Sequence, residues 1–149
     1  CLCGCGGYST LLGQFFSVPF PSFILASNLD INALELLSIV VALKLWATSL
    51  QGRRVQILCD NLTSVLVLRS GRVKNQYLCA CLREIAFICA VNMLELRVAH
   101  IEGCSNRLSD LLSRVHLHPE YLDQFLQEVG TEMTRVRVSE SLFHLSEQW

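Results

Sequence analysis

Charge is scarce in this sequence. Only 17% of its 149 residues are Asp, Glu, Lys or Arg, the formal net charge is -1, and residues 1–29 carry no charge at all. Affinity for phosphate comes mostly from Lys and Arg, so this balance argues against strong autonomous binding to nucleic acid. Because 52% of the residues are hydrophobic, the chain can bury a sizeable core, and disorder is not expected.

Long hydrophobic runs are also missing. The longest one beyond the N-terminal region, at 36–43, contains a Ser and is far too short to cross a bilayer. The uncharged N-terminal stretch has no basic leader and is interrupted by glycine and proline, at Gly4, Gly6, Gly7, Pro19 and Pro21. Neither a signal peptide nor a membrane span fits it, so we expect an intracellular protein, cytoplasmic or nuclear, that is not secreted. The chain begins with Cys1 rather than Met, which indicates a fragment, a processed product or an incomplete gene model.

Eight cysteines do not make this chain a disulfide scaffold. The sequence is rich in apolar residues, and Cys79 and Cys89 fall at inward positions of a helical pattern, where Cys behaves as a small buried hydrophobe. Cysteine alternates with other residues at 1–5, which looks like a metal tract. Alternate residues of a strand point to opposite faces, however, and no second Cys or His pair completes a zinc spacing nearby, so zinc is not expected there.

Hydrophobic periodicity predicts one domain of mixed secondary structure. The patterns favour a hairpin over 1–18 with its second strand at 14–18, a connecting segment at 21–30 with a short extended piece at 23–25, helices at 32–50, 62–68, 75–91 and 106–113, a buried strand at 54–59, and an alternating strand at 94–99. Asn32 is the expected N-cap of the first helix, and Glu35 can complete a capping box with it. Strands followed by alternating helices and strands imply a mixed sheet covered by helices.

The character of the sequence changes beyond Arg114. A connecting segment contains His116, His118 and Pro119. After it, the apolar residues Leu122, Phe125, Leu126 and Val129 recur with helical spacing. A brief strand at 135–138 and a last helix at 139–149 are expected after it. We therefore divide the chain into residues 1–114 and a C-terminal extension, residues 115–149, which either packs on the core or starts the next module.

Three acidic residues stand in settings that suit a metal-binding or catalytic role. Asp60 directly follows an apolar strand, at the edge where open α/β sheets place their sites. Glu35 opens an amphipathic helix, and Asp110 follows Asn106 by four positions on one face of a short helix. Each has a structural alternative, because Asp60 can cap the next helix, Glu35 can close the capping box and Asp110 can be an ordinary surface acid. If the three carboxylates converge at one sheet edge, they can hold divalent metal and cut phosphodiesters.

The order of three short motifs resembles a known family. The motifs are the segment 31–36 (INALEL), Cys59-Asp60-Asn61, and the run from His100-Ile101-Glu102-Gly103 through Asn106 and Asp110 to 112–114 (LSR). Together they are similar to the ribonuclease H domain of reverse-transcribing elements; DIRS-type retroelements with a tyrosine recombinase are the nearest group, and pararetroviral domains are more distant. The resemblance covers about residues 1–114. It implies an α/β fold with an RNase H-like mixed five-stranded sheet, helices on both faces and a truncated first strand.

The resemblance also implies a set of catalytic residues. The family's helix Glu maps onto Glu35, the Asp that ends its fourth strand onto Asp60, the Asp of its last core helix onto Asp110, and its mobile-loop His onto His100. The family's first-strand Asp has no counterpart in this sequence, and the alignment places it just before Cys1. Whether the chain is an active enzyme is therefore left open at this point.

The implied chemistry is hydrolysis assisted by two divalent ions, Mg²⁺ or Mn²⁺, about 4 Å apart across the scissile phosphate. Glu35, Asp60 and Asp110 are the implied ligands, since hard cations prefer oxygen to sulfur. His100 is implied to shuttle a proton or to help release the cut strand. Its structural alternative is a loop His that faces solvent or bonds to the backbone.

The implied partners are an RNA–DNA hybrid, selected through 2′-hydroxyls in the wide minor groove, and the adjacent reverse transcriptase domain of the same polyprotein. Asn61 and Asn106 neighbour the acids and are candidates to reach ribose or phosphate. Arg69, Arg72 and Lys74 cluster in the turn between the two middle helices and are candidates for phosphate contacts. The alternative is a solvated basic turn.

Three functions are therefore under consideration. The leading one is the RNase H domain of a retroelement reverse transcriptase, which hydrolyses RNA in RNA–DNA hybrids. The alternative is a catalytically inactive RNase H-like binding or connection domain from a decayed or co-opted element, which the unmatched first-strand Asp supports. A third, resolvase or transposase chemistry on DNA, ranks lower because of Asn61 and the reverse-transcriptase-type loop around His100.

Overall fold

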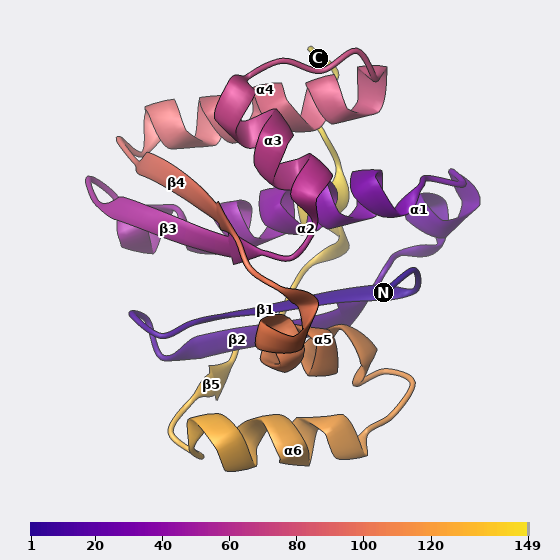
Figure 1. The fold of residues 1–149 in the computed structure, drawn as a ribbon, viewed down its shortest axis with the longest axis vertical. Helices are drawn as coiled ribbons and strands as arrows, with labels where there is room; N and C mark the ends of the chain where they lie inside the picture. The colour runs from indigo at the N-terminus through magenta and orange to yellow at the C-terminus, as the bar shows by residue number, and fades with distance from the viewer. Residues whose placement is uncertain (149) are drawn as a thin grey trace.

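The computed structural model describes residues 1–148, and it has a mixed α/β fold (Figure 1). The elements in chain order are β1 (Gly4–Ser9), β2 (Gln14–Pro19), α1 (Ser22–Ala26), α2 (Ile31–Trp46), the 3-10 turn η1 (Thr48–Leu50), β3 (Arg54–Cys59), α3 (Leu62–Ser70), α4 (Gln76–Val91), β4 (Glu95–His100), η2 (Gly103–Asn106), α5 (Arg107–Arg114), α6 (Glu120–Val129), β5 (Thr134–Arg135) and η3 (Glu140–Phe143). The prediction of a mixed α/β architecture is confirmed.

The five strands form two sheets rather than one. β1 and β2 pair antiparallel and β5 adds to β2 in parallel, whereas β3 and β4 pair in parallel as a separate two-stranded sheet. In Figure 1, β3 lies on the side of its sheet that faces β1. Within the described residues, neither β1 nor β3 has a strand partner on that side. The expectation of a single five-stranded sheet is therefore not met, because no described strand bridges these two edges.

Helix α2 is the centre of the core. It is buried on almost every side, with Leu36, Leu37, Val40 and Val41 fully enclosed, so it behaves as an internal helix rather than an amphipathic one. The predicted capping box is wrong. The Ala33 N–H donates to the carboxylate of Asp30 (2.8 Å), so Asp30 is the N-cap, and Glu35 lies too far into the helix to close a box with it.

The β1–β2 hairpin is covered on both faces, as predicted for the sheet. Successive residues of β2 show this, because Phe16 packs into the core with α2 while Phe15 packs with α5 and α6. Helix α5 comes so close to β1 that a Cβ on Gly6 would lie 2.4 Å from Leu112 Cβ. Glycine at this position therefore lets α5 lie directly against the strand.

The β3–β4 sheet is covered on one face only. Val55 and Ile57 of β3 pack on the core, whereas Arg54, Gln56 and Leu58 between them are exposed. The prediction of a strand buried on both faces is wrong for β3, and so is the expectation of helices on both sides of this sheet. The alternating burial is the pattern of a half-solvated sheet.

Several local predictions also need correction. Residues 23–25 are helical in α1, not extended, and the last helix expected at 139–149 is only the 3-10 turn η3, with Trp149 outside the described residues. The buried positions of α4 include Cys81, Glu84 and Ile88, so its inward face is turned from the predicted one, and Cys79 and Cys89 are only partly buried. Buried Glu84 is matched by Lys44 of α2, whose Nζ lies 2.9 Å from its carboxylate.

Residues 115–148 pack against the core. Phe125 of α6 is fully buried and its ring contacts those of Phe15 (centroids 4.9 Å apart) and Tyr8 (5.7 Å). Phe143 of η3 is buried and contacts the ring of Phe20. The boundary at residue 114 stays a prediction, but the segment that follows it supplies one end of the hydrophobic core. No helix within residues 1–148 has the length and apolar character needed to span a bilayer.

Candidate functional site

The three acids singled out in the sequence line one cavity. Glu35 comes from the second turn of α2, Asp60 from the residue after β3, and Asp110 from α5, and all three border a cavity of about 70 Å³ beside β1. The other lining residues are small or polar, namely Cys1, Gly4, Cys5, Gly6, Ser38, Asn106, Ser109 and Ser113. The fold thus gathers carboxylates from three distant segments around one small polar space.

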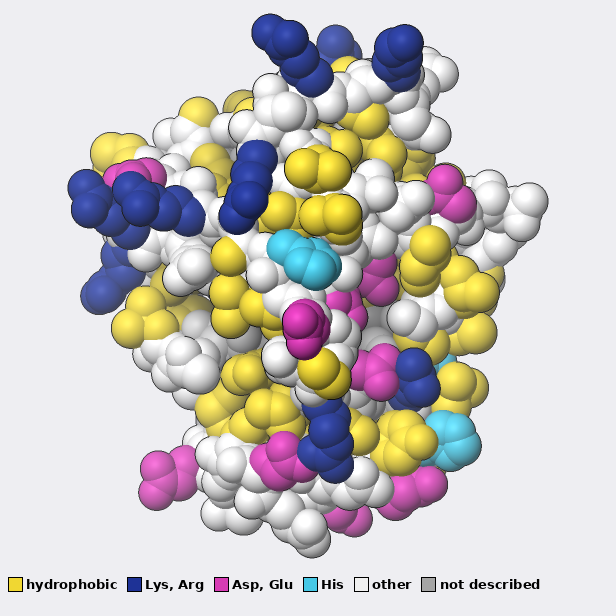
Figure 2. Space-filling view, viewed as in Figure 1, with side chains coloured by type: hydrophobic (Ala, Val, Ile, Leu, Met, Phe, Trp, Pro, Cys, Tyr) yellow, Lys and Arg dark blue, Asp and Glu magenta, His cyan; other side chains and the backbone are white. Residues whose placement is uncertain are grey.

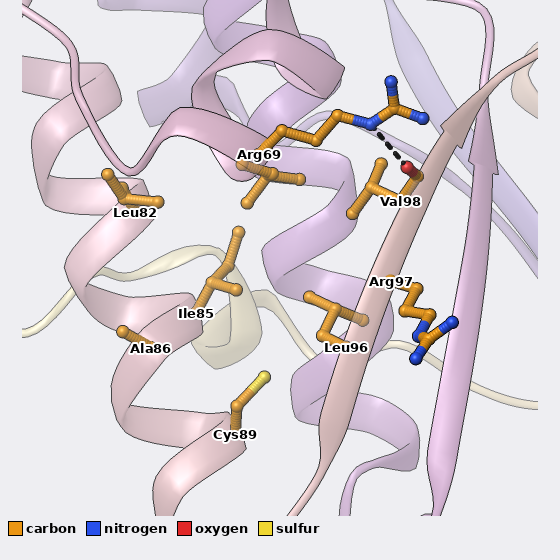
Figure 3. Close-up of a pocket in the computed structure, with 9 residues that line it drawn as sticks. Arg69, Leu82, Ile85, Ala86, Cys89, Leu96, Arg97 and Val98 are labelled. Atoms are coloured by element: carbon orange, nitrogen blue, oxygen red, sulfur yellow. Dashed lines mark hydrogen bonds between the residues drawn. The ribbon is translucent and has the colours of Figure 1, made fainter.

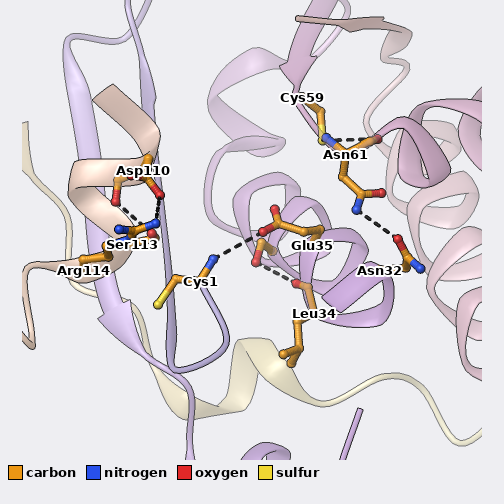
Figure 4. A network of polar contacts seen from close by, with 10 residues as sticks. Cys1, Asn32, Leu34, Glu35, Cys59, Asn61, Asp110, Ser113 and Arg114 are labelled. Carbon is orange, nitrogen blue, oxygen red and sulfur yellow. Dashed lines mark hydrogen bonds and ion pairs between the residues drawn. The ribbon is translucent and has the colours of Figure 1, made fainter. Parts of the chain in front are cut away.

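The pKa of Glu35 is shifted by its surroundings. Burial raises the pKa of its carboxyl group, the nearby Cys1 ammonium lowers it, and the negative charges of Asp60 and Asp110 raise it further. The Cys1 ammonium lies 3.6 Å from Glu35 Oε1, and Figure 4 shows it pointing across the cavity at this carboxylate. The cavity therefore favours a positive charge beside Glu35.

Asp110 and Asp60 have different surroundings. Asp110 forms an ion pair with Arg114 one helical turn later (2.8 Å), and its backbone carbonyl accepts a hydrogen bond from Ser113 Oγ (2.8 Å). Asp60 is half-buried. A Cβ placed on Gly103 of η2 would lie 3.9 Å from Asp60 Oδ2. The η2 turn therefore lies close to the Asp60 carboxylate.

The donor set suits a hard divalent cation by its chemistry, because carboxylate and hydroxyl oxygens dominate the cavity wall. The distances between these side chains are less favourable for a single ion. Within residues 1–148, no three His, Cys, Asp or Glu side chains lie close enough together to hold one ion. Mg²⁺ or Mn²⁺ binding by Glu35, Asp60 and Asp110 therefore stays a prediction. Cys5, from the cysteine tract at 1–5, also borders the cavity, and burial raises the pKa of its thiol to about 12.

His100 stands beside the acids rather than among them. It ends β4, pairs in register with Cys59, and is exposed. Its Nε2 lies 3.2 Å from the backbone carbonyl oxygen of Asp60, so the ring is held at the rim while Nδ1 is left for exchange with solvent or substrate. This contact matches the backbone-bonded alternative, and it also keeps the imidazole next to the acid that it is predicted to assist.

Of the two asparagines, Asn61 has a structural role and Asn106 borders the cavity. Asn61 Oδ1 accepts a hydrogen bond from the Ser64 N–H (2.7 Å) and caps α3, while its Nδ2 donates to Asn32 Oδ1 (3.0 Å). Both ends of this side chain are thus engaged within the protein. Asn106 makes no side-chain capping bond at the start of α5 and lines the cavity, so of the two it is better placed to reach a ligand.

The basic turn lies away from the cavity. Helix α3 leads from Asn61 to Arg69, a rise of about 12 Å at 1.5 Å per residue. Arg69, Arg72 and Lys74 are exposed, and Arg69 Nε donates to the Val98 carbonyl of β4 (3.0 Å). The structure therefore does not bring these three side chains to the acids, and their phosphate contacts stay a prediction.

Some lining residues were not predicted from the sequence. Ser38 lies three residues after Glu35, and Ser109 and Ser113 flank Asp110, so helical spacing would have placed them on the faces of the two acids. The approach of Cys1 and Gly4 to Glu35 is non-local and leaves no such signal. No family model, curated protein or solved structure matches the chain.

Proposed function

We propose that this chain is a ribonuclease H-like domain of a retroelement reverse transcriptase, which hydrolyses RNA in RNA–DNA hybrids with the help of divalent cations. The single observation that supports this most is the shared cavity of Glu35, Asp60 and Asp110. Acids that merely cap helices or face solvent have no reason to meet, and here none of the three serves as an N-cap. In this proposal the domain works beside its polymerase domain, in the cytoplasm or the nucleus.

The proposal includes a specific sheet arrangement. An extended segment joined before Cys1 would lie between β1 and β3 and unite the two sheets, bringing a fourth carboxylate to the cavity. The unpaired edges of β1 and β3 support this, because exposed rows of backbone N–H and C=O groups are templates for a further strand. The cavity lies in the same region, since Gly6 of β1 and Asp60 after β3 both border it.

Each residue has a role that its surroundings support. Glu35, Asp60 and Asp110 would hold the ions, which supply an activated water and stabilise the leaving oxygen. The raised pKa of Glu35 comes first from burial and then from repulsion by Asp60 and Asp110, and a bound cation would stabilise its charged form. His100 would exchange a proton at the rim, where its Nε2 is already fixed by Asp60. The Asn106 side chain makes no capping hydrogen bond at the start of α5, and it would orient the substrate.

A second function is favoured by one observation. One of the three carboxylates already faces a protein cation, since Asp110 pairs with Arg114. An inactive RNase H-like binding or connection domain would retain such an internal pair without needing metal. The two functions differ in one measurable property, which is cleavage.

The test is cleavage of an end-labelled RNA–DNA hybrid with Mg²⁺ or Mn²⁺. It compares this 149-residue chain with a chain extended upstream in the parent reading frame, and both with their Asp60→Asn variants. We expect the extended chain to cut the RNA strand well, the shorter chain to cut poorly, and Asp60→Asn to abolish cutting, because the amide cannot neutralise a divalent ion.

A matched control is Glu102→Gln, which removes an exposed carboxylate from the turn after β4 but not from the cavity lining. This variant should cut like the wild type. Equal activity of the Asp60→Asn variant would remove Asp60 from the mechanism. A folded extended chain that does not cut would favour the binding or connection domain.

A further inference from the structure

Basic residues are concentrated in one part of this weakly charged chain. Residues 53–97 contain seven of the 12 Lys and Arg residues but only three of the 13 Asp and Glu residues. All seven are exposed: Arg53, Arg54, Arg69, Arg72, Lys74, Arg83 and Arg97. Figure 2 shows Lys and Arg side chains gathered at the top and upper left of the molecule, where Figure 1 places α3, α4, β3 and β4.

The acids of this segment do not cancel that charge. Glu84 is buried against Lys44, and Asp60 borders the cavity. Only Glu95 is exposed, and it is shared between Arg54 (2.7 Å) and Arg97 (3.1 Å). The surface of this half is therefore strongly positive, although the whole chain carries a net charge of -1.

The arginines are placed on a continuous surface. Arg54 and Arg97 belong to the uncovered face of the β3–β4 sheet, where the register sets Arg54 opposite Glu95 and Gln56 opposite Arg97. Arg97 also borders, with Arg69, a cleft of about 490 Å³ between α3, α4 and β4. Figure 3 shows Arg69 bonded to Val98 through Nε, with its two terminal nitrogens directed away from that bond, while the Arg97 side chain leaves β4 on the side away from α4.

We propose that this arginine surface, defined by Arg54, Arg69 and Arg97 on β3, α3 and β4, binds a phosphate backbone. The backbone is that of the nucleic acid whose scissile phosphate meets the acids of the cavity. This inference rests on the proposed function and extends it by naming where the duplex runs. Asp60 lies six positions after Arg54 along β3, a distance of about 20 Å at 3.3 Å per residue. Duplex phosphates on one strand repeat every 3.4 Å, so the surface spans about six base pairs.

The chemistry favours backbone contacts over base reading. The guanidinium groups are exposed on a sheet face and a helix end, where they can meet phosphates as paired donors. Contacts of this kind position a protein on a duplex and carry no sequence information. Binding at this surface is therefore independent of base sequence and strongly dependent on salt.

The test measures binding without cleavage. A fluorescein-labelled RNA–DNA hybrid is titrated with the full chain in EDTA, by fluorescence anisotropy, at KCl concentrations between about 50 and 200 mM. The variants are Arg69→Gln, Arg97→Gln and the charge-preserving Arg97→Lys. The matched control is Arg137→Gln, an exposed arginine outside the arginine surface. Circular dichroism confirms that each variant is folded.

We expect Arg69→Gln and Arg97→Gln each to weaken binding and to reduce the slope of log affinity against log salt concentration by about 1. A fourfold rise in salt should therefore reduce the affinity of each variant by a factor about fourfold smaller than the factor for the wild type. Arg97→Lys and Arg137→Gln should keep the wild-type slope. Unchanged slopes in both glutamine variants, or an equal change in Arg137→Gln, would overturn the proposal.

The outcome is separable from that of the proposed function. If the arginine variants behave as expected and no form of the chain cleaves, the arginine surface stands as a binding surface and the hydrolase fails. If cleavage occurs with unchanged slopes, the hydrolase stands and the arginine surface fails.

Discussion

Phe125→Ala should destabilise the whole domain and not only its C-terminal segment. Phe125 is fully buried among Phe15, Leu111 and Leu112, and truncation of such a side chain to Ala costs about 3–5 kcal/mol in lost burial and residual cavity. For a chain of this size, about 2–4 °C of melting temperature is lost per kcal/mol, so we expect a fall of about 6–20 °C. Leu111 and Leu112 belong to α5, so the loss also loosens the helix that carries Asp110.

The assay is thermal unfolding followed by circular dichroism, with Leu117→Ala as the matched control. Leu117 lies in the same segment and is 53% exposed, so its truncation should leave the melting temperature almost unchanged. A Phe125→Ala variant that melts like the wild type would refute the packing described for α6. The same conclusion would follow if a chain ending at residue 114 were as stable as the full chain.

Two further predictions concern the cavity and the helix beside it. Glu35→Gln should be more stabilising at pH 7 than at pH 4. Burial raises the pKa of Glu35 above its ordinary value of 4.5, so the stability of the wild type falls as the pH rises through and above that value. Urea unfolding that gives the same stability difference between variant and wild type at both pH values would contradict this. Gly6→Ala should cost about 1–3 kcal/mol through overpacking, because the new Cβ would lie 2.4 Å from Leu112 Cβ. Gly103→Ala is the control, since its Cβ meets only Asp60, at an ordinary 3.9 Å, and equal urea midpoints for the two alanine variants would count against the close approach of α5 to β1.

The local elements could be predicted because their signals are local. Asn61 and Asn75 cap α3 and α4 with their side-chain oxygens, and Gly71 ends α3 in the left-handed conformation (φ 64°), as residues of these types commonly do. The helix α1 was not predicted, because Pro21 at its start favoured a connecting segment with an extended piece. Its carbonyl instead accepts the N–H groups of Ile24 and Leu25, and proline is well tolerated where a helix begins.

The tertiary arrangement was harder to predict. Helix α2 is apolar almost all round, so its periodicity could not show which side faces the sheet, and Asp30 competed with Asn32 for the cap. The separation of the two sheets depends on which strand edges meet, which no single segment encodes. The three acids were found because each occupies a recognisable local position, while the pairing of Glu35 with the Cys1 ammonium required the folded chain.

Calorimetric titration with Mg²⁺, on the chain extended upstream, is the most direct test of the central idea that Glu35, Asp60 and Asp110 share one cation site. Replacing any one of the three by its amide should weaken binding markedly, whereas Glu102→Gln should not. Unaltered Mg²⁺ affinity in all three amide variants would mean that the acids border the same cavity without acting together.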